Sequence, residues 1–122
     1  MPKRVLIVED DEKSRRLLAD VLGFHGYEVV TASSGEEGLT AICDAMPDIA
    51  LLDIQLPGMS GFDVLGALRG IPEIEHMPIL AVTASVMDAE RIRILAAGFN
   101  GIVSKPVNIK QLNTILQQAL ER

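Results

Sequence analysis

The sequence predicts an α/β fold in which helices cover both faces of a parallel sheet, and two observations support this. Short apolar runs rich in Val, Ile and Leu alternate with longer segments whose apolar residues recur at helical spacing along the 122 residues. Runs such as 5–8 and 49–52 carry no polar residue at alternate positions, which is typical of strands buried on both faces. Since such βα units connect through right-handed crossovers, we expect a doubly wound sheet.

Five strands are expected, at residues 5–8, 27–32, 49–52, 79–82 and 102–104. The first helix follows an acidic run and should end near Gly26, which suits a left-handed helix end. A second helix should begin at about Gly35, because Ser34 and Glu37 have the spacing of a capping box. It should stop before Pro47, since the residue preceding a proline avoids the helical conformation.

Three more helices are expected after the third, fourth and fifth strands. Ser60 and Asp63 suit the start of the third helix. The fourth should run from Val86 to Ala97, with the least clear apolar stripe of the five. Asn108 and Gln111 suit the start of the last helix, whose apolar residues keep helical spacing to the end of the sequence.

Composition limits the classes of function. A chain of 122 residues with 48% hydrophobic residues is expected to form one domain with a substantial core. An aromatic fraction of 3% argues against a stacking platform for single-stranded nucleic acid, and a net charge of −6 argues against binding a phosphate backbone. A protein partner or a metal ion fits this charge better.

The single cysteine, Cys43, excludes an internal disulfide and fits a reducing compartment, and we expect it to be a small buried hydrophobe. No segment resembles a signal peptide or has the ~20 apolar residues that a membrane span needs. We therefore expect a cytoplasmic protein that binds no membrane.

Polar residues stand where four of the predicted strands end: Glu9, Asp10, Asp11, Asp53, Thr83 and Lys105. Ligands of open α/β sheets bind beyond the carboxyl ends of the strands, so these side chains should lie at one edge. Carboxylates, a hydroxyl and an ammonium together make a site for a hard divalent cation and a phosphoryl group.

Four motifs occupy these strand ends: Val8-Glu9-Asp10-Asp11, Leu52-Asp53-Ile54-Gln55-Leu56-Pro57-Gly58-Met59-Ser60-Gly61, Val82-Thr83-Ala84 and Ser104-Lys105-Pro106. Together they resemble the receiver domain of two-component response regulators, in the family's order and over the whole chain. The resemblance implies a flavodoxin-like sheet of order 2-1-3-4-5 with five helices. Residues 1–122 would form a single receiver domain, similar in length to the stand-alone receivers of the chemotaxis and DivK types.

The resemblance implies that Asp53 accepts a phosphoryl group from a phosphohistidine on a sensor histidine kinase or a histidine phosphotransfer protein. Lys105 would pair with a phosphoryl oxygen, and the Thr83 hydroxyl and the amide following Asp53 would donate to others. Phosphorylation would change the binding of a downstream protein target through Thr83 and Lys105. Such a domain is a switch rather than an enzyme, since it catalyses only its own phosphorylation and dephosphorylation.

Mg²⁺ is the cofactor that the resemblance implies. Asp10, Asp53 and the main-chain carbonyl of Gln55 would coordinate the ion, and Glu9 would act directly or through a water. Oxygen ligands with near-octahedral geometry suit Mg²⁺. Gln55 and Ser85 are expected to tune the lifetime of the acyl phosphate, and the family implies a cis bond between Lys105 and its proline.

One position departs from the family. Its members carry an aromatic residue three positions before the lysine, which rotates inward on phosphorylation, and Ile102 stands there instead. Isoleucine has neither a ring nor a hydroxyl. We therefore expect phosphorylation to reshape the loop from Ala84 to Asp88 and to produce a smaller or different change at the fifth strand.

Other interpretations are open at this point. The run 9–11 would also suit an acidic helix start that the helix dipole favours. A metal-dependent phosphatase of the haloacid-dehalogenase type would need a second acid where Gln55 stands. A pseudo-receiver that binds partners without phosphorylation would lack the acceptor, the metal acid or the lysine, and all three are present.

Basic residues of the first helix are candidates for contact with the phosphoryl donor: Lys13, Arg15 and Arg16. The alternative is that all three are solvated surface charges.

Overall fold

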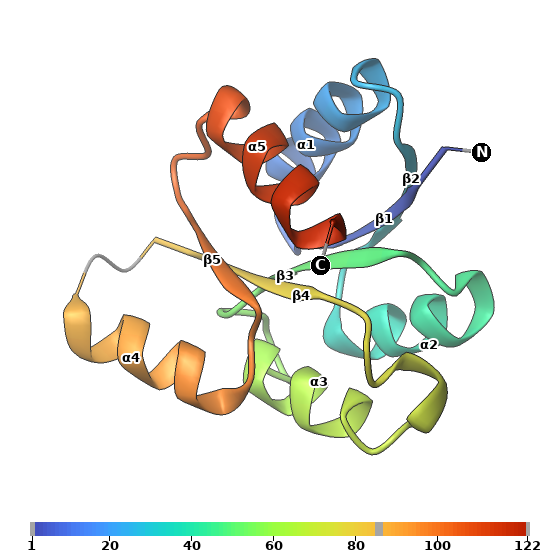
Figure 1. The fold of residues 1–122 in the computed structure, drawn as a ribbon. Coiled ribbons are helices and arrows are strands. Elements are labelled where there is room, and N and C mark those ends of the chain that lie inside the picture. The colour runs from blue at the N-terminus through green and yellow to red at the C-terminus, as the bar shows by residue number, and fades with distance from the viewer. Residues whose placement is uncertain (1, 85–86, 122) are drawn as a thin grey trace.

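The computed structural model describes residues 2–84 and 87–121, and a five-stranded parallel sheet forms its centre (Figure 1). The strands are β1 Arg4–Val8, β2 Glu28–Ala32, β3 Ile49–Asp53, β4 Ile79–Thr83 and β5 Gly101–Ser104. Their order is β2-β1-β3-β4-β5 with every neighbouring pair parallel, which confirms the predicted sheet. β3 therefore lies at the middle, between the strand that leads into the acidic run and the strand that ends in Thr83.

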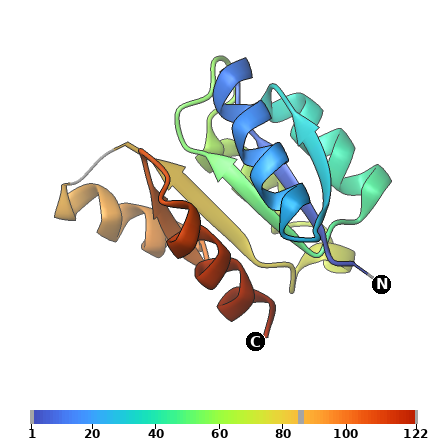
Figure 2. The same cartoon turned by 90° about the horizontal axis from the view of Figure 1, so that it is seen from above.

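Helices cover both faces of this sheet, as a doubly wound fold requires (Figure 1). The helices are α1 Glu12–Phe24, α2 Gly35–Ala45, α3 Gly61–Leu68, α4 Asp88–Ala97 and α5 Ile109–Leu120. α1 and α5 lie on one face, nearest the viewer in Figure 2, and α2, α3 and α4 lie on the other. A short 3-10 helix, η1 Pro72–Ile74, precedes β4 and was not predicted from the sequence.

The core consists of two aliphatic layers, one on each face of the sheet. Leu6 and Val8 pack in the layer beneath α2, α3 and α4, whereas Val5 and Ile7 pack in the layer beneath α1 and α5. This alternation follows from the two-residue period of a strand. β3 is buried along its whole length, so a polar group at its end needs compensating partners.

Caps fix where two helices begin. Ser34 accepts a hydrogen bond from the Glu37 amide at the start of α2, but the Glu37 carboxylate bonds to the amide and hydroxyl of Ser33, each at 2.7 Å. The capping box predicted there is therefore half formed. At α3 the box is complete, since Ser60 and Asp63 each accept from the other's amide. This box anchors the start of the helix that follows the loop after β3.

The prediction that Cys43 is buried was wrong, because its side chain is exposed. The buried residues of α2 are Gly35, Gly38 and Ile42. Cys43 follows Ile42 directly, and one residue turns a helix by about 100°, which places the thiol outside that stripe.

The fourth helix is described from Asp88, since Val86, where it was predicted to begin, lies outside the described residues. Ile94 is the residue of α4 that is buried, which agrees with the weak apolar stripe of this segment. Among the helices of residues 2–84 and 87–121, none combines the length and the apolar character that a membrane span requires.

Candidate functional site

The acidic run after β1 divides into two parts with different roles. The Glu9 amide still donates to the carbonyl of Ala32 on β2, 3.1 Å away, and the side chain of Glu9 is buried. Asp10 is exposed, while Asp11 caps α1 by accepting from the Ser14 amide at 2.9 Å. Hydrogen bonds from Ser14 hold the pKa of Asp11 below its usual value. The interpretation of this run as an acidic helix start therefore applies to Asp11. Glu9 and Asp10 are candidates for a ligand-binding site.

Asp53 ends β3 as a carboxylate in an apolar layer, with 4% of its surface exposed. One carboxylate oxygen accepts from the Gln55 amide at 2.9 Å, and the other accepts from the Lys105 ammonium at 2.7 Å. Charge-assisted hydrogen bonds of this kind compensate the cost of burying the carboxylate.

Lys105 bridges the two buried acids. Its Nζ lies 2.7 Å from Asp53 Oδ2 and 2.8 Å from Glu9 Oε1, and it reaches them from the segment after β5. Burial alone would lower the pKa of Lys105, but the hydrogen bonds to Asp53 and Glu9 outweigh it, so the pKa lies above its usual value. The bond between Lys105 and Pro106 is cis, as predicted. The ammonium is therefore firmly charged at neutral pH.

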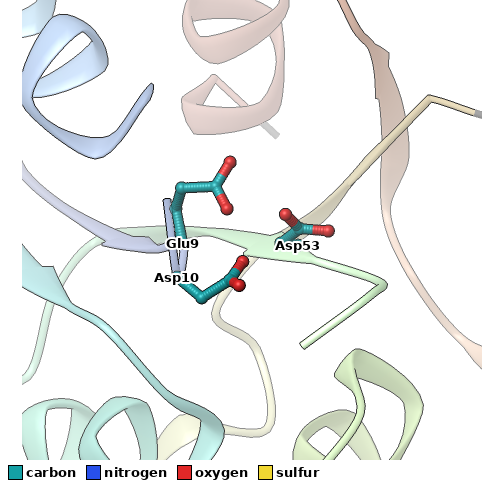
Figure 3. A group of neighbouring side chains, drawn as sticks. All are labelled: Glu9, Asp10 and Asp53. Carbon is teal, nitrogen blue, oxygen red and sulfur yellow. The ribbon is translucent and has the colours of Figure 1, made fainter. Parts of the chain in front are cut away.

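Three carboxylates converge at the carboxyl edge of the sheet (Figure 3). Each of Glu9, Asp10 and Asp53 offers one carboxylate oxygen, and these three oxygens all lie within 4.8 Å of one another. The side chains come from two neighbouring strand ends and point toward a common space. Three hard oxygen donors with one exposed member suit Mg²⁺, which retains several waters and takes few protein carboxylates.

Thr83 ends β4 beside this cluster, buried to 4% exposure. The register pairs Asp53 with Val82, which places Thr83 one residue beyond the partner of Asp53. The Thr83 carbonyl accepts from the Lys105 amide at 2.8 Å, so the main chain joins Thr83 and Lys105 directly. All six residues predicted at the strand ends thus lie near one edge, as the parallel topology requires.

The prediction for the amide following Asp53 was wrong. The Ile54 amide continues the sheet by donating to the Val82 carbonyl at 3.1 Å, so it does not face the site. The Gln55 amide lies against the Asp53 carboxylate instead. Gln55 also lines an open pocket of about 600 Å³ beside the cluster, together with Asp10. The pocket therefore borders the acidic cluster at its exposed member, Asp10.

Residues 5–117 match the family model described as the response regulator receiver domain. The chain belongs to the response regulator receiver domain family. It is 39% identical over 109 residues to the polar-differentiation response regulator DivK of Brucella anthropi, covering 89% of each chain. Members of the family are phosphoacceptors in two-component signalling, work with histidine kinases and downstream targets, and generally bind Mg²⁺.

Solved structures agree with this assignment. A response regulator of Chloroflexus aurantiacus is 35% identical, with a TM-score of 0.95 and complete coverage of both chains. The receiver domain of the sensor histidine kinase PA1611 of Pseudomonas aeruginosa is 26% identical, with a TM-score of 0.92 and complete coverage of both chains. That structure holds a magnesium ion in its active site cleft. This protein is thus a receiver domain and has a phosphoacceptor role in two-component signalling.

The fifth strand of this receiver domain replaces the family's aromatic with Ile102, which is half-buried and packs against the layer beneath α4. A polar contact lies close by: Arg91 of α4 donates to the Ser104 hydroxyl at 2.8 Å, one residue before Lys105. This link between α4 and the end of β5 was not predicted, because it needs the fold to bring two distant segments together. Ser85, predicted to tune the phosphoryl lifetime, lies outside the described residues.

Gly61 allows the loop after β3 to return close to Asp53. A Cβ at position 61 would lie 2.6 Å from the Asp53 carbonyl oxygen and 2.9 Å from Ile54 Cα, both backbone atoms that cannot move aside. We expect Gly61→Ala to destabilise the protein by about 1–3 kcal/mol, the usual cost of overpacking. Urea unfolding monitored by circular dichroism measures this.

Gly66 provides the matched control, because it lies in the same helix and a Cβ there would meet nothing within 4 Å. Gly66→Ala should stabilise the protein by about 0.5–1 kcal/mol through the higher helix propensity of alanine. Equal effects of the two substitutions would contradict the close approach at Gly61.

The raised pKa of Lys105 predicts a loss of stability at alkaline pH. Since the folded-state pKa lies above the usual value of 10.5, the ion pairs stabilise the fold fully below that pH. Their contribution disappears as the pH rises through the folded-state pKa. The free energy of unfolding of wild type minus that of Lys105→Met should therefore be constant up to about pH 10 and shrink from there to about pH 12, measured by urea unfolding. A difference that stays constant over this range would refute the prediction.

Proposed function

We propose that Asp53 is the phosphoryl acceptor of this receiver domain and takes the group from a phosphohistidine on a sensor histidine kinase or a histidine phosphotransfer protein. One observation carries the proposal: Asp53 is a buried carboxylate whose two oxygens are held by the Lys105 ammonium and the Gln55 amide. These two donors are positioned to neutralise negative charge that arrives on a neighbouring phosphoryl group. Two further carboxylates stand within reach.

The chemistry is the transfer of a phosphoryl group between two nucleophiles. An Asp53 carboxylate oxygen forms a bond to phosphorus while the bond from phosphorus to the donor's imidazole nitrogen breaks, and the acyl phosphate results. Lys105 and the Thr83 hydroxyl bind phosphoryl oxygens, and the Gln55 amide replaces the amide of Ile54 in the role predicted from the sequence. The domain catalyses only this step and the later hydrolysis, in which water returns the carboxylate.

Mg²⁺ is the cofactor we propose, held by Asp10, Asp53 and the Gln55 carbonyl, with Glu9 acting directly or through a water. The converging carboxylates support this, as does the magnesium ion in the cleft of the PA1611 receiver domain. When bound, the ion neutralises charge on the incoming phosphoryl group. Removing Mg²⁺ should therefore prevent phosphorylation.

The output proposed is a change in binding of a downstream protein, transmitted by Thr83 and Lys105 and by the loop from Ala84 to Asp88, of which residues 85 and 86 are not described. Because Ile102 cannot rotate as an aromatic does, the change at β5 should be smaller than in family members that carry the aromatic, or different from it.

We further propose that residues 1–122 act as a single cytoplasmic receiver domain that contacts neither nucleic acid nor membrane. The net charge of −6 and the single cysteine support this.

The geometry does not favour the alternatives. A pseudo-receiver would lack one part of the site, whereas Asp10, Asp53 and Lys105 come together here. A phosphatase of the haloacid-dehalogenase type would require a second acid at position 55, and the glutamine that stands there has no carboxylate.

The test is the intact mass of the protein after incubation with acetyl phosphate, with Mg²⁺ and with excess EDTA. We expect the mass of one phosphoryl group to be added in Mg²⁺ and none in EDTA. Beryllofluoride, which forms a stable mimic of the acyl phosphate, is added in a parallel titration followed by amide NMR. Absence of both phosphoryl uptake and beryllofluoride binding would overturn the proposal.

A further inference from the structure

Arg15 contacts the turn that carries the two acids of the first strand end. Its Nη1 donates to the Glu9 carbonyl oxygen at 2.9 Å and lies 3.5 Å from the Asp10 carbonyl oxygen. The side chain is half-buried, unlike the exposed side chains of Lys13 and Arg16, with which it was grouped as a docking candidate. The structure thus separates Arg15 from its basic neighbours.

The same residue also binds the next carbonyl along the chain. The Arg15 amide donates to the Asp11 carbonyl at 2.9 Å, as the first turn of α1 requires. Backbone and side chain of Arg15 therefore hold three consecutive carbonyls, those of Glu9, Asp10 and Asp11. Both side-chain contacts come from one nitrogen, Nη1, of a guanidinium that is always charged.

Two of these three carbonyls belong to Glu9 and Asp10, whose carboxylates meet that of Asp53 within 4.8 Å. Glu9 is further fixed by its amide bond to β2 and by Lys105, but Asp10 is exposed and projects from the turn itself. The direction of the Asp10 carboxylate therefore depends on the conformation of the turn. A loose turn would have to be ordered whenever a cation binds, which weakens the binding.

We propose that Arg15 is a positioning residue of the metal site: by clamping the Glu9 and Asp10 carbonyls, it keeps the Asp10 carboxylate directed at the space shared with Asp53. This inference rests on the proposed function, since it concerns the acids proposed to bind Mg²⁺. It assigns Arg15 a role within this chain, in place of the docking role considered from the sequence.

Two effects of Arg15 on a cation have opposite signs, which makes the inference testable. Its positive charge near the acids repels Mg²⁺, so charge removal alone would tighten Mg²⁺ binding. Its clamp on the turn favours binding, so loss of the clamp would weaken it. Residues that hold metal ligands in place typically change metal affinity 10–100-fold when they are removed, and a contact through main-chain carbonyls should fall at the lower end, at about tenfold.

The experiment measures Mg²⁺ affinity by isothermal titration calorimetry for wild type, Arg15→Ala and Arg16→Ala. Arg16→Ala is the matched control, because it removes the same charge one residue further along the helix. Among the hydrogen bonds of the described residues, those to the turn come from Arg15 and none comes from Arg16. Arg15→Ala should bind Mg²⁺ about tenfold more weakly than wild type. Arg16→Ala should bind as wild type does or slightly more tightly. In parallel titrations followed by NMR, the Gln55 amide resonance reports binding at the site itself.

Unchanged or tighter Mg²⁺ binding by Arg15→Ala would overturn the inference and leave the proposed function intact. A wild-type protein that binds no Mg²⁺ would instead overturn the proposed function. Thermal unfolding without Mg²⁺ shows whether Arg15→Ala is folded. If it is not, Arg15→Met takes its place with Arg16→Met as its control: both variants lose one charge and keep an unbranched side chain, so weaker Mg²⁺ binding by Arg15→Met reports the lost contacts, and equal affinity of the two variants would refute the clamp.

Discussion

Replacing Asp53 by Asn should abolish phosphoryl uptake from acetyl phosphate while the protein remains folded. The amide has nearly the shape of the carboxylate and can still accept from the Gln55 amide, which lies 2.9 Å from Asp53 Oδ1. It is not a nucleophile toward phosphorus, so no acyl phosphate can form. Intact mass after incubation with acetyl phosphate and Mg²⁺ measures the effect, and circular dichroism confirms the fold.

Asp44→Asn is the control for this substitution, because Asp44 is an exposed carboxylate on α2, away from the acidic edge. It should take up one phosphoryl group as wild type does. If Asp53→Asn were phosphorylated to the same extent as Asp44→Asn, Asp53 would not be the acceptor.

Lys105→Met should produce the largest change in stability among substitutions at the site. It keeps the length of the side chain but leaves the buried Glu9 and Asp53 carboxylates facing each other without a cation. Removing one partner of a fully buried pair costs about 3–5 kcal/mol. Because the Lys105 side chain is 30% exposed, we expect a smaller loss, about 2 kcal/mol in the free energy of unfolding without metal.

Mg²⁺ should restore part of this loss in Lys105→Met, since a cation that binds only the folded acids stabilises the fold by mass action. The variant should also bind Mg²⁺ more tightly than wild type, because the ammonium no longer repels the ion. Urea unfolding at several Mg²⁺ concentrations measures both effects, with the exposed Lys110 replaced by Met as the control. A Lys105→Met variant as stable as Lys110→Met without metal would show that the ion pairs contribute nothing.

The convergence of the acidic edge was predictable from the sequence because it depends on topology alone. Apolar runs without alternation indicated strands buried on both faces, and parallel strands bring their carboxyl ends to one edge. Asp53 and Thr83 end neighbouring strands, so their proximity follows once β3 and β4 pair. The predicted strand order needed the family resemblance as well, because composition and periodicity do not specify which strands are neighbours.

Features that depend on register and side-chain packing were not predictable. The hydrogen-bond ladder between β3 and β4 extends one residue past β3, where the Ile54 amide donates to the Val82 carbonyl. The Gln55 amide is therefore the one that faces the Asp53 carboxylate, and the sequence does not specify where the ladder ends. The contact of the Arg15 side chain with the turn before α1 depends on its rotamer. From the sequence alone, Arg15 could not be distinguished from Arg16, another basic residue of the same helix. The exposure of Cys43 follows from where the buried stripe of α2 falls, which a one-residue rotation changes.

The identity of the phosphorylated residue is the central claim, and borohydride reduction tests it most directly. Hydride reduces the acyl phosphate of an aspartate to the alcohol of homoserine and releases phosphate, so the modified position can be read by peptide mass spectrometry. After incubation with acetyl phosphate and Mg²⁺, we predict homoserine at position 53 and at no other aspartate. Homoserine at position 10 or 11 in its place would contradict the account.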